Sequence, residues 1–230
     1  MEKWDLHCHT AEVSACANIP AEQLVELYVR HGYDGVVITD HLNGATFQNH
    51  RETGWKERLD FYLSGYERTK QAAKGRLKVL LGTELSCKEN NNDYLIFGIT
   101  EDFLREYNTE AGSLRDMRIS QISELLHENG MLLFQAHPFR NGMSVVSPSY
   151  LDGIESYNGN PRHASRNDIA QLWAKKYNLL ETSGSDFHEI EDAARGGILT
   201  PVCIENQADL IRALRQRPER IMTLDGFHKV

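Results

Sequence analysis

The sequence predicts a single α/β domain in which a parallel sheet, closed into a barrel, is covered by helices. Short apolar runs of strand length alternate along the chain with segments whose apolar residues recur at helical spacing. The apolar runs are nearly continuous, as in strands that are buried on both faces of a parallel sheet. Seven or eight such units in one chain favour a barrel over an open sheet.

The predicted strands are short apolar runs that stop at polar residues. The first is "KWDLHC" from Lys3, and the second is "GVVITD" from Gly35. The later runs are "LKVLLGTEL", "YLIFGIT", "MLLFQAH", "GIESY", "LLETSGSD", "ILTPVCI" and "RIMTL", which start at Leu77, Tyr94, Met131, Gly153, Leu179, Ile198 and Arg220.

Helices are predicted where apolar residues form a stripe. One stripe contains Leu24, Leu27 and Tyr28, between Pro20 and Gly32. The other two consist of Ile119, Ile122, Leu125 and Leu126 before Gly130, and of Ile169, Leu172, Trp173, Lys176 and Tyr177. We expect all three stripes to face the core.

The least structured stretch runs from Asn43 to Arg58 and is predicted to be a long loop over one end of the barrel. Such a loop could act as a lid or as a wall of a substrate site. No linker, internal repeat or low-complexity segment interrupts the pattern, so we expect one domain over residues 1–230.

Composition excludes several classes of protein. A net charge of −8 argues against an extended basic surface for nucleic acid. No apolar run approaches the length of a membrane span, and the N-terminus lacks a signal pattern, so we expect a cytoplasmic protein without membrane partners. The four cysteines lack the paired spacing of a disulfide framework or a structural zinc knuckle, so we expect neither.

Two histidines stand at the end of the first predicted strand. Residues at positions i and i+2 of a strand point to the same face, so His7 and His9 should lie side by side. Neutral imidazoles make a poor core pair and good metal ligands. A surface strand with two hydrogen-bonded histidines is the alternative.

Apolar strands repeatedly stop at a histidine or a carboxylate, and in a barrel the carboxyl ends of the strands form one mouth. The polar residues at these ends are Asp5, His7, His9, Asp40, His41, Glu84, His137, Glu155, Asp186 and His188, and Asp93 begins a further strand. These ligands are too many for one tetrahedral zinc and enough for two or three divalent ions. Imidazole with carboxylate suits zinc, iron or manganese.

The remaining histidines are scattered, and we assign them no function, although His163 in a polar loop is left open. They are His31, His50, His127, His163 and His228.

The ordered motifs "DLHCHT", "ITDH", "GTELS", "AHP" and "GSDFH" resemble the polymerase and histidinol phosphatase family of metal-dependent phosphoesterases. The resemblance runs from Asp5 to about Gly197. It implies a distorted (β/α)7 TIM-like barrel with a metal cluster, usually trinuclear, at the carboxyl mouth.

The resemblance also implies a role for each matching residue. The expected metal ligands are His7, His9 and Asp186 for the first ion, Glu84 as the bridge between the first two ions, His137 for the second ion, and His41 and His188 for the third. Glu84, Asp186 and His188 are the residues of this set that we also expect to be catalytic. Asp5 and Asp40 are expected to orient the imidazoles as outer partners.

The sequence departs from the common family pattern in two places. Asp93 stands where many members have a histidine ligand; it could ligate the second ion or cap the turn after "KENNN". The segment "TAEVSAC" replaces a stretch that often supplies a ligand of the third ion. Ala15 cannot ligate, so Glu12 is the nearest candidate and Cys16 the next.

These observations predict hydrolysis of a phosphate monoester, on a small metabolite such as histidinol phosphate or on a nucleotide, through a hydroxide that bridges two ions. Arg140 and then Arg195 are candidates to bind the phosphate, although either could be a solvated surface arginine. The alternatives are a nuclease or nucleotide phosphodiesterase, and a non-catalytic metal-binding regulatory domain. The sequence does not predict an oligomeric state.

Overall fold

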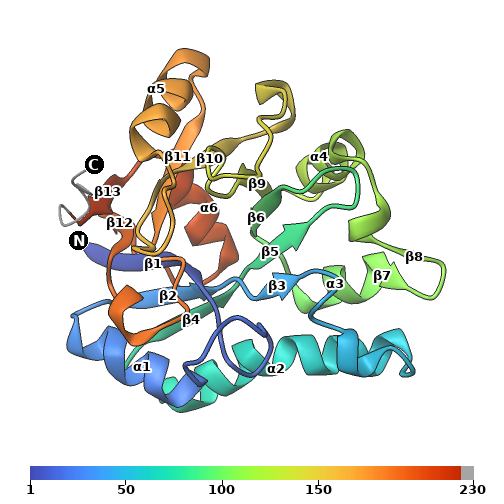
Figure 1. Cartoon of the computed structure of the whole chain (residues 1–230). Helices are drawn as coiled ribbons and strands as arrows, with labels where there is room; N and C mark the ends of the chain where they lie inside the picture. Colours follow the sequence, from blue (N-terminus) through green and yellow to red (C-terminus); the bar gives the residue numbers. More distant parts are fainter. Residues whose placement is uncertain (224–230) are drawn as a thin grey trace.

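Two mixed sheets form the centre of the structure, a computed structural model that describes residues 1–223 (Figure 1). The first sheet has the order β13–β12–β1–β2–β4. Its strands are β1 (Glu2–Cys8), β2 (Gly35–Ile38), β4 (Lys78–Leu81), β12 (Gly196–Thr200) and β13 (Glu219–Met222). His228, to which we assign no function, lies outside the described residues.

The second sheet has the order β11–β10–β9–β6–β5–β3. Its strands are β3 (His41–Leu42), β5 (Thr83–Ser86), β6 (Asp93–Phe97), β9 (Leu132–Gln135), β10 (Gly153–Asn158) and β11 (Leu180–Gly184). A small hairpin of β7 (Asn108–Thr109) and β8 (Gly112–Ser113) lies apart from both sheets.

Helices surround the two sheets (Figure 1). They are α1 (Ala21–Arg30), α2 (Trp55–Ala73), α3 (Glu101–Tyr107), α4 (Ile119–Glu128), α5 (Asn167–Tyr177) and α6 (Gln207–Arg215). Short 3₁₀ turns occupy Gln48–His50, Leu114–Asp116, Pro148–Tyr150 and Ile190–Asp192. Within residues 1–223 no helix combines the length and the apolar character that crossing a membrane requires.

All of the predicted strands are present, but the sheets are mixed rather than parallel. The β5–β6, β6–β9, β1–β12 and β12–β13 pairs are antiparallel. Residues 87–92, between β5 and β6, are too few for the helical crossover that a parallel pair needs. The described strands form separate sheets, so the mixed α/β class is confirmed and the closed, distorted (β/α)7 barrel stays a prediction.

The two sheets meet at the strand ends that carry the polar motifs. Beyond β1 and β11 the chain is tied together by a hydrogen bond of 3.1 Å from Phe187 N to His7 O, and by one of 3.1 Å from His9 N to Phe187 O. On the other side, Glu84 N donates to Asp40 O at 3.2 Å. These backbone bonds bring the motifs around His9, Asp40, Glu84 and Phe187 to one place.

Two expectations about helices are corrected. The predicted loop from Asn43 to Arg58 ends early, because α2 begins at Trp55. Small and polar residues, Gly65, Thr69 and Ala73, form part of the buried face of α2, so no long apolar stripe marks it in the sequence.

Most of the stripe on α5 faces outward, although Trp173 is partly buried against the core. Ile169 is 41% exposed and Leu172 is 69% exposed, whereas the buried residues of this helix are Ala170 and Ala174. Two alanines allow α5 to approach β10 closely, and this close packing decides the orientation in place of the larger side chains.

We predict that Gly65→Ala destabilises the protein although alanine favours helix. A Cβ atom at this position would collide with the side chains of Thr10 and Asp40, whose hydrogen bonds hold the chain after β1. Thermal unfolding should show a loss of about 1–3 kcal/mol. Gln71→Ala, at an exposed site of the same helix, should change stability by less than about 0.5 kcal/mol; equal stability of the two variants would contradict this packing.

Candidate metal centre

His7 and His9 enter the site from the end of β1. Both side chains are fully buried, and their ring centroids lie 5.0 Å apart. The alternation of the strand therefore places both imidazoles on the inner side of the junction between the sheets. They do not form the exposed pair that was the alternative.

Glu84 lies at the centre of the imidazoles. Its Oε2 atom is 3.4 Å from His7 Nε2, 3.2 Å from His9 Nε2 and 2.8 Å from His41 Nδ1. Its Oε1 atom is 3.0 Å from His137 Nε2. The pairing of β3 with β5 sets His41 directly opposite Glu84, so the contact follows from the register of these two strands.

Asp186 contributes a second carboxylate after β11. Its Oδ1 atom is 3.5 Å from the Nε2 atoms of both His7 and His9, and 3.4 Å from His188 Nδ1. Its Oδ2 atom accepts from Arg140 at 2.5 Å. One oxygen of Asp186 therefore faces the imidazoles while the other faces a cation.

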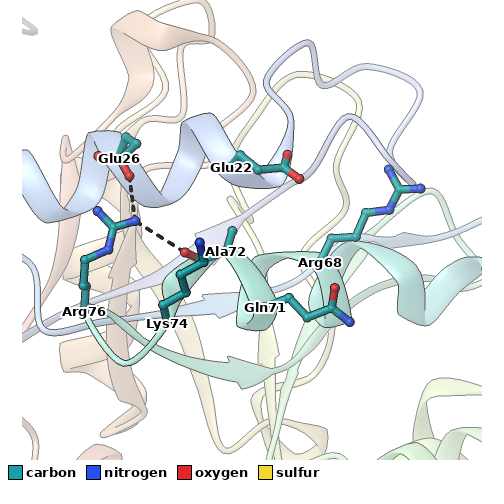
Figure 2. A pocket seen from close by; sticks show the side chains of 7 residues that line it. All are labelled: Glu22, Glu26, Arg68, Gln71, Ala72, Lys74 and Arg76. Carbon is teal, nitrogen blue, oxygen red and sulfur yellow. Dashed lines mark hydrogen bonds and ion pairs between the residues drawn. The ribbon is translucent and has the colours of Figure 1, made fainter.

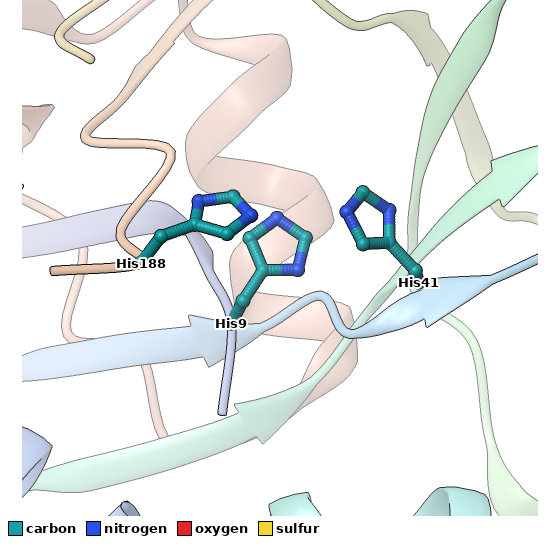
Figure 3. A group of neighbouring side chains, drawn as sticks. All are labelled: His9, His41 and His188. Atoms are coloured by element: carbon teal, nitrogen blue, oxygen red, sulfur yellow. The ribbon is translucent and has the colours of Figure 1, made fainter. Parts of the chain in front are cut away.

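Three overlapping groups of side chains bring their ligand atoms within 4.8 Å of one another. These groups are His7, His9 and Glu84; Glu84, Asp93 and His137; and His9, His41 and His188. Figure 3 shows the last group, in which the His9 ring lies between the other two, with centroids 4.3 Å from each. Glu84 belongs to two groups, as a bridging carboxylate would.

Several buried atoms at the centre lack hydrogen-bond partners. They are Glu84 Oε2, His7 Nε2, His9 Nε2 and His41 Nδ1. A buried polar atom without a partner costs about 1–3 kcal/mol, and these atoms face one another at distances of 2.8–3.4 Å. A divalent cation among them would satisfy all of them, so the donor set fits a metal ion.

The imidazoles and the carboxylates of the centre shift one another's pKa values. Burial alone would lower the pKa values of His7 and His41, but nearby carboxylates, Glu155 for His7 and Glu84 for both, raise them well above the usual value. Burial alone would raise the pKa of Glu84, but His41 and His7 hold it well below. The imidazoles and the Glu84 carboxylate therefore stabilise each other's charged forms.

A further shell of side chains orients the rings. Glu155 Oε1 lies 2.8 Å from His7 Nδ1, and Ser14 Oγ lies 3.2 Å from His9 Nδ1. Ser14 in turn donates to Asp40 at 2.7 Å, so Asp40 acts on His9 through the serine. Such contacts fix which ring nitrogen is left for a metal.

Asp5 acts on the backbone and not on an imidazole ring. Its carboxylate accepts from His7 N at 3.1 Å, from Ser185 N at 3.0 Å and from the hydroxyl of Tyr28 at 2.7 Å. It therefore joins the ends of β1 and β11. Burial raises the pKa of Asp5 to about 6.

Two of the candidate ligands have an unusual backbone. His137 has φ of +29° and Asp186 has φ of +50°, which non-glycine residues rarely adopt. Each lies two residues beyond the end of a strand, β9 for His137 and β11 for Asp186, and the turned backbone aims the side chain at the cluster instead of continuing the sheet. Strain of this kind concentrates at functional sites.

Asp93 lies with Glu84 and His137, as a ligand at this position would. Ser86 Oγ hydrogen-bonds its carboxylate, and Ser86 faces it across the β5–β6 pair. Burial and the charge of Glu84 raise the pKa of Asp93. The side chain therefore faces the centre and is not limited to capping the preceding turn.

Two candidates from the sequence are not brought to the cluster. The Glu12 carboxylate accepts from Ala21 N at 3.2 Å and so caps α1. Arg195 Nε donates to Gly159 O at 3.0 Å. Arg140 does reach the cluster through Asp186, with its side chain 17% exposed.

The sequence placed Glu155 among the strand-end carboxylates at the mouth but assigned it no contact with His7, and it assigned no role to Ser14. Ser14 carries no signal in the sequence, because its contacts depend on how the loop after β1 turns back over Asp40.

A separate surface groove lies between α1 and α2 (Figure 2). Its lining residues are Glu22, Glu26, Arg68, Gln71, Ala72, Lys74 and Arg76. The ion pair between Arg76 and Glu26, at 2.6 Å, joins two half-exposed side chains. None of these residues belongs to the imidazole cluster, so we place no chemistry there.

A family model described as the PHP domain matches residues 5–227. The chain belongs to the PHP domain family. Among curated protein sequences, none matches the chain.

Solved structures share the fold of this PHP domain at low sequence identity. PsfC from Pseudomonas syringae is 15% identical, with a TM-score of 0.67 over 98% of this chain and 94% of that one. A two-domain protein from Bacteroides vulgatus, described as containing a predicted PHP-like metal-dependent phosphoesterase, is 16% identical, with a TM-score of 0.64 over 96% of this chain and 64% of that one. The lesion-specific endonuclease PfuEndoQ from Pyrococcus furiosus is 18% identical, with a TM-score of 0.62 over 95% of this chain and 57% of that one.

We predict that His7→Ala impairs turnover far more than stability. Removal of an outer partner of a metal ligand costs about 10–100-fold, so loss of a ligand should lower turnover by more than about 100-fold and reduce the bound metal. Metal analysis and unfolding curves check this. His31→Ala, at an exposed position after α1, is the control. Normal turnover with full metal content in His7→Ala would remove His7 from the site.

We predict that Asp93→Ala loses one metal ion, because Glu84 and His137 alone offer too few ligands, whereas Asp93→His retains it. Metal content after dialysis distinguishes the two. Asp102→Ala, on the exposed side of α3, controls for loss of an acidic residue. Full metal content in Asp93→Ala would show that the carboxylate only accepts the hydrogen bond from Ser86.

Proposed function

We propose that the protein hydrolyses phosphate monoesters of a small metabolite or nucleotide, with divalent ions held by the cluster around Glu84. The convergence of unpartnered buried atoms on Glu84 Oε2 is the observation that carries this proposal. Membership of the PHP domain family supports it, since two structural neighbours are described as PHP-like or putative metal-dependent phosphoesterases.

The ligand groups suggest two or three ions, with zinc, iron or manganese suited to the donors. In the proposed arrangement, His7, His9 and Asp186 hold the first ion and His137 and Asp93 hold the second, with Glu84 between them. His41 and His188 lie at the outer edge. When bound, such ions act as Lewis acids and bring the pKa of a bound water close to neutrality.

Arg140 is the residue that we propose binds the phosphate. Its guanidinium donates to Asp186 at 2.5 Å and to Asn158 at 3.4 Å, while its Nε is buried without a partner. The unpartnered Nε of Arg140 is free to donate to a phosphate oxygen at the same mouth. The position of Arg195 against Gly159 makes it the weaker candidate.

A panel of generic substrates tests the proposal on protein reconstituted with zinc or manganese. We expect turnover of an aryl phosphate monoester and little turnover of the corresponding diester. Diester turnover above monoester turnover would indicate the nuclease or phosphodiesterase alternative. Full metal content without turnover of either would indicate a binding or regulatory domain. We also propose that the protein is cytoplasmic and that its substrate is a small phosphorylated molecule.

We predict that Arg140→Ala lowers kcat/KM for the monoester by about 10–100-fold, since a hydrogen bond to a charged group contributes about 1.5–3 kcal/mol. Steady-state kinetics at saturating metal check this. Arg30→Ala, exposed at the end of α1, should be unchanged, and Arg195→Ala should lose less than Arg140→Ala. An unchanged kcat/KM in Arg140→Ala would remove it from the phosphate site.

A further inference from the structure

An exposed cysteine stands at the outer edge of the metal centre. Cys16 Sγ lies 3.1 Å from His188 Nε2, and the thiol also interacts with the His41 imidazole. Cys16 belongs to the loop that follows β1 and carries Glu12 away toward α1. The thiol is thus the side chain of this loop that meets the imidazole edge.

The loop is tied to both of the histidine segments that it faces. Ser14 Oγ accepts from His41 N at 3.1 Å. Asn18 N donates to His188 O at 3.0 Å. Because these two anchors flank Cys16 in the sequence, they hold the backbone around Cys16 beside the two histidine segments.

The histidines gathered at this edge also point to a ligand. The fully buried His9 ring lies between the two outer rings, and the Nδ1 atom of His41 is buried without a hydrogen-bond partner. Ligand atoms of all three histidines lie within 4.8 Å of one another. Atoms that share one tetrahedral zinc are separated by roughly 3.5 Å, given the usual bond lengths, and the 3.1 Å between Cys16 Sγ and His188 Nε2 is close to that separation.

We propose that Cys16 is a thiolate ligand, together with His41 and His188, of an ion at the outer edge of the centre, and that this edge therefore prefers zinc to manganese. The inference rests on the proposed metal centre and adds to it the donor that the sequence left open. Thiolate is a soft ligand that favours zinc, whereas carboxylate suits manganese. The exposure of Cys16 leaves one side of the ion open to solvent or substrate.

The other cysteines are suitable for comparison. Cys8 and Cys87 are buried, and Cys203 is exposed. Cys203 lies near Glu2 and Glu205, but Lys78 Nζ already provides the positive charge there, at 3.6 Å from the Cys203 sulfur. Cys203→Ser is therefore a matched control that removes an exposed thiol from a place where we expect no metal.

Cobalt(II) substitution tests the proposal directly, because a cysteine thiolate bound to cobalt gives a charge-transfer absorption in the near ultraviolet. We expect this absorption in the wild-type protein and in Cys203→Ser. It should be absent in Cys16→Ser, with about one equivalent of cobalt lost. Cys16→Asp should recover the equivalent without the absorption, and its outer ion should be displaced by manganese more readily than in the wild type.

The outcomes separate this inference from the proposed function. Wild-type protein that binds two or more cobalt ions without the thiolate absorption would overturn the role of Cys16 and leave the rest of the centre standing. The same conclusion follows if Cys16→Ser keeps both the absorption and the cobalt content. Wild-type protein that binds no cobalt, zinc or manganese would overturn the proposed metal centre together with the role of Cys16.

Discussion

The buried carboxylate of Glu84 is the constraint on which the arrangement of the strand ends depends. A charge without access to water is stable only beside opposite charge and hydrogen-bond donors. Four imidazoles contact Glu84, from the ends of β1 and β9 and from β3. The hydrogen bonds of Asp5, Asp40 and Glu155 hold these strand ends in register. The packing of the two sheets and the geometry of the site therefore depend on each other, because the junction between the sheets closes around this carboxylate.

Much of the fold could be predicted because buried strands have apolar sequences that can be recognised directly. The apolar strands are visible as runs that end at a polar residue, and the histidines at these ends do come together. The alternation of His7 and His9 along β1 was enough to place both rings on one face. Helix α2 was not predicted because glycine, threonine and alanine form part of its buried face. The buried residues of α5 are alanines and not most of its larger apolar residues.

The rest depends on contacts between residues far apart in the chain. The turn between β5 and β6 makes that pair antiparallel, although each strand reads like its parallel neighbours. The sequence favoured Glu12 over Cys16 as a ligand of the third ion. In the structure Glu12 caps the start of α1 and Cys16 contacts His188. The support of His9 by Asp40 through Ser14 spans three separate segments, which a linear pattern does not reveal.

The central claim is that a divalent cation belongs among the imidazoles around Glu84. Anomalous diffraction from crystals grown with zinc or manganese tests this most directly, because it locates the ion independently of activity. The account predicts an anomalous peak about 2.0–2.2 Å from Glu84 Oε2, the usual length of a zinc–carboxylate bond, with ring nitrogens of His7 and His9 facing the same peak. Crystals grown with the metal that show no peak there, and Glu84 paired only with protonated imidazoles, would contradict it.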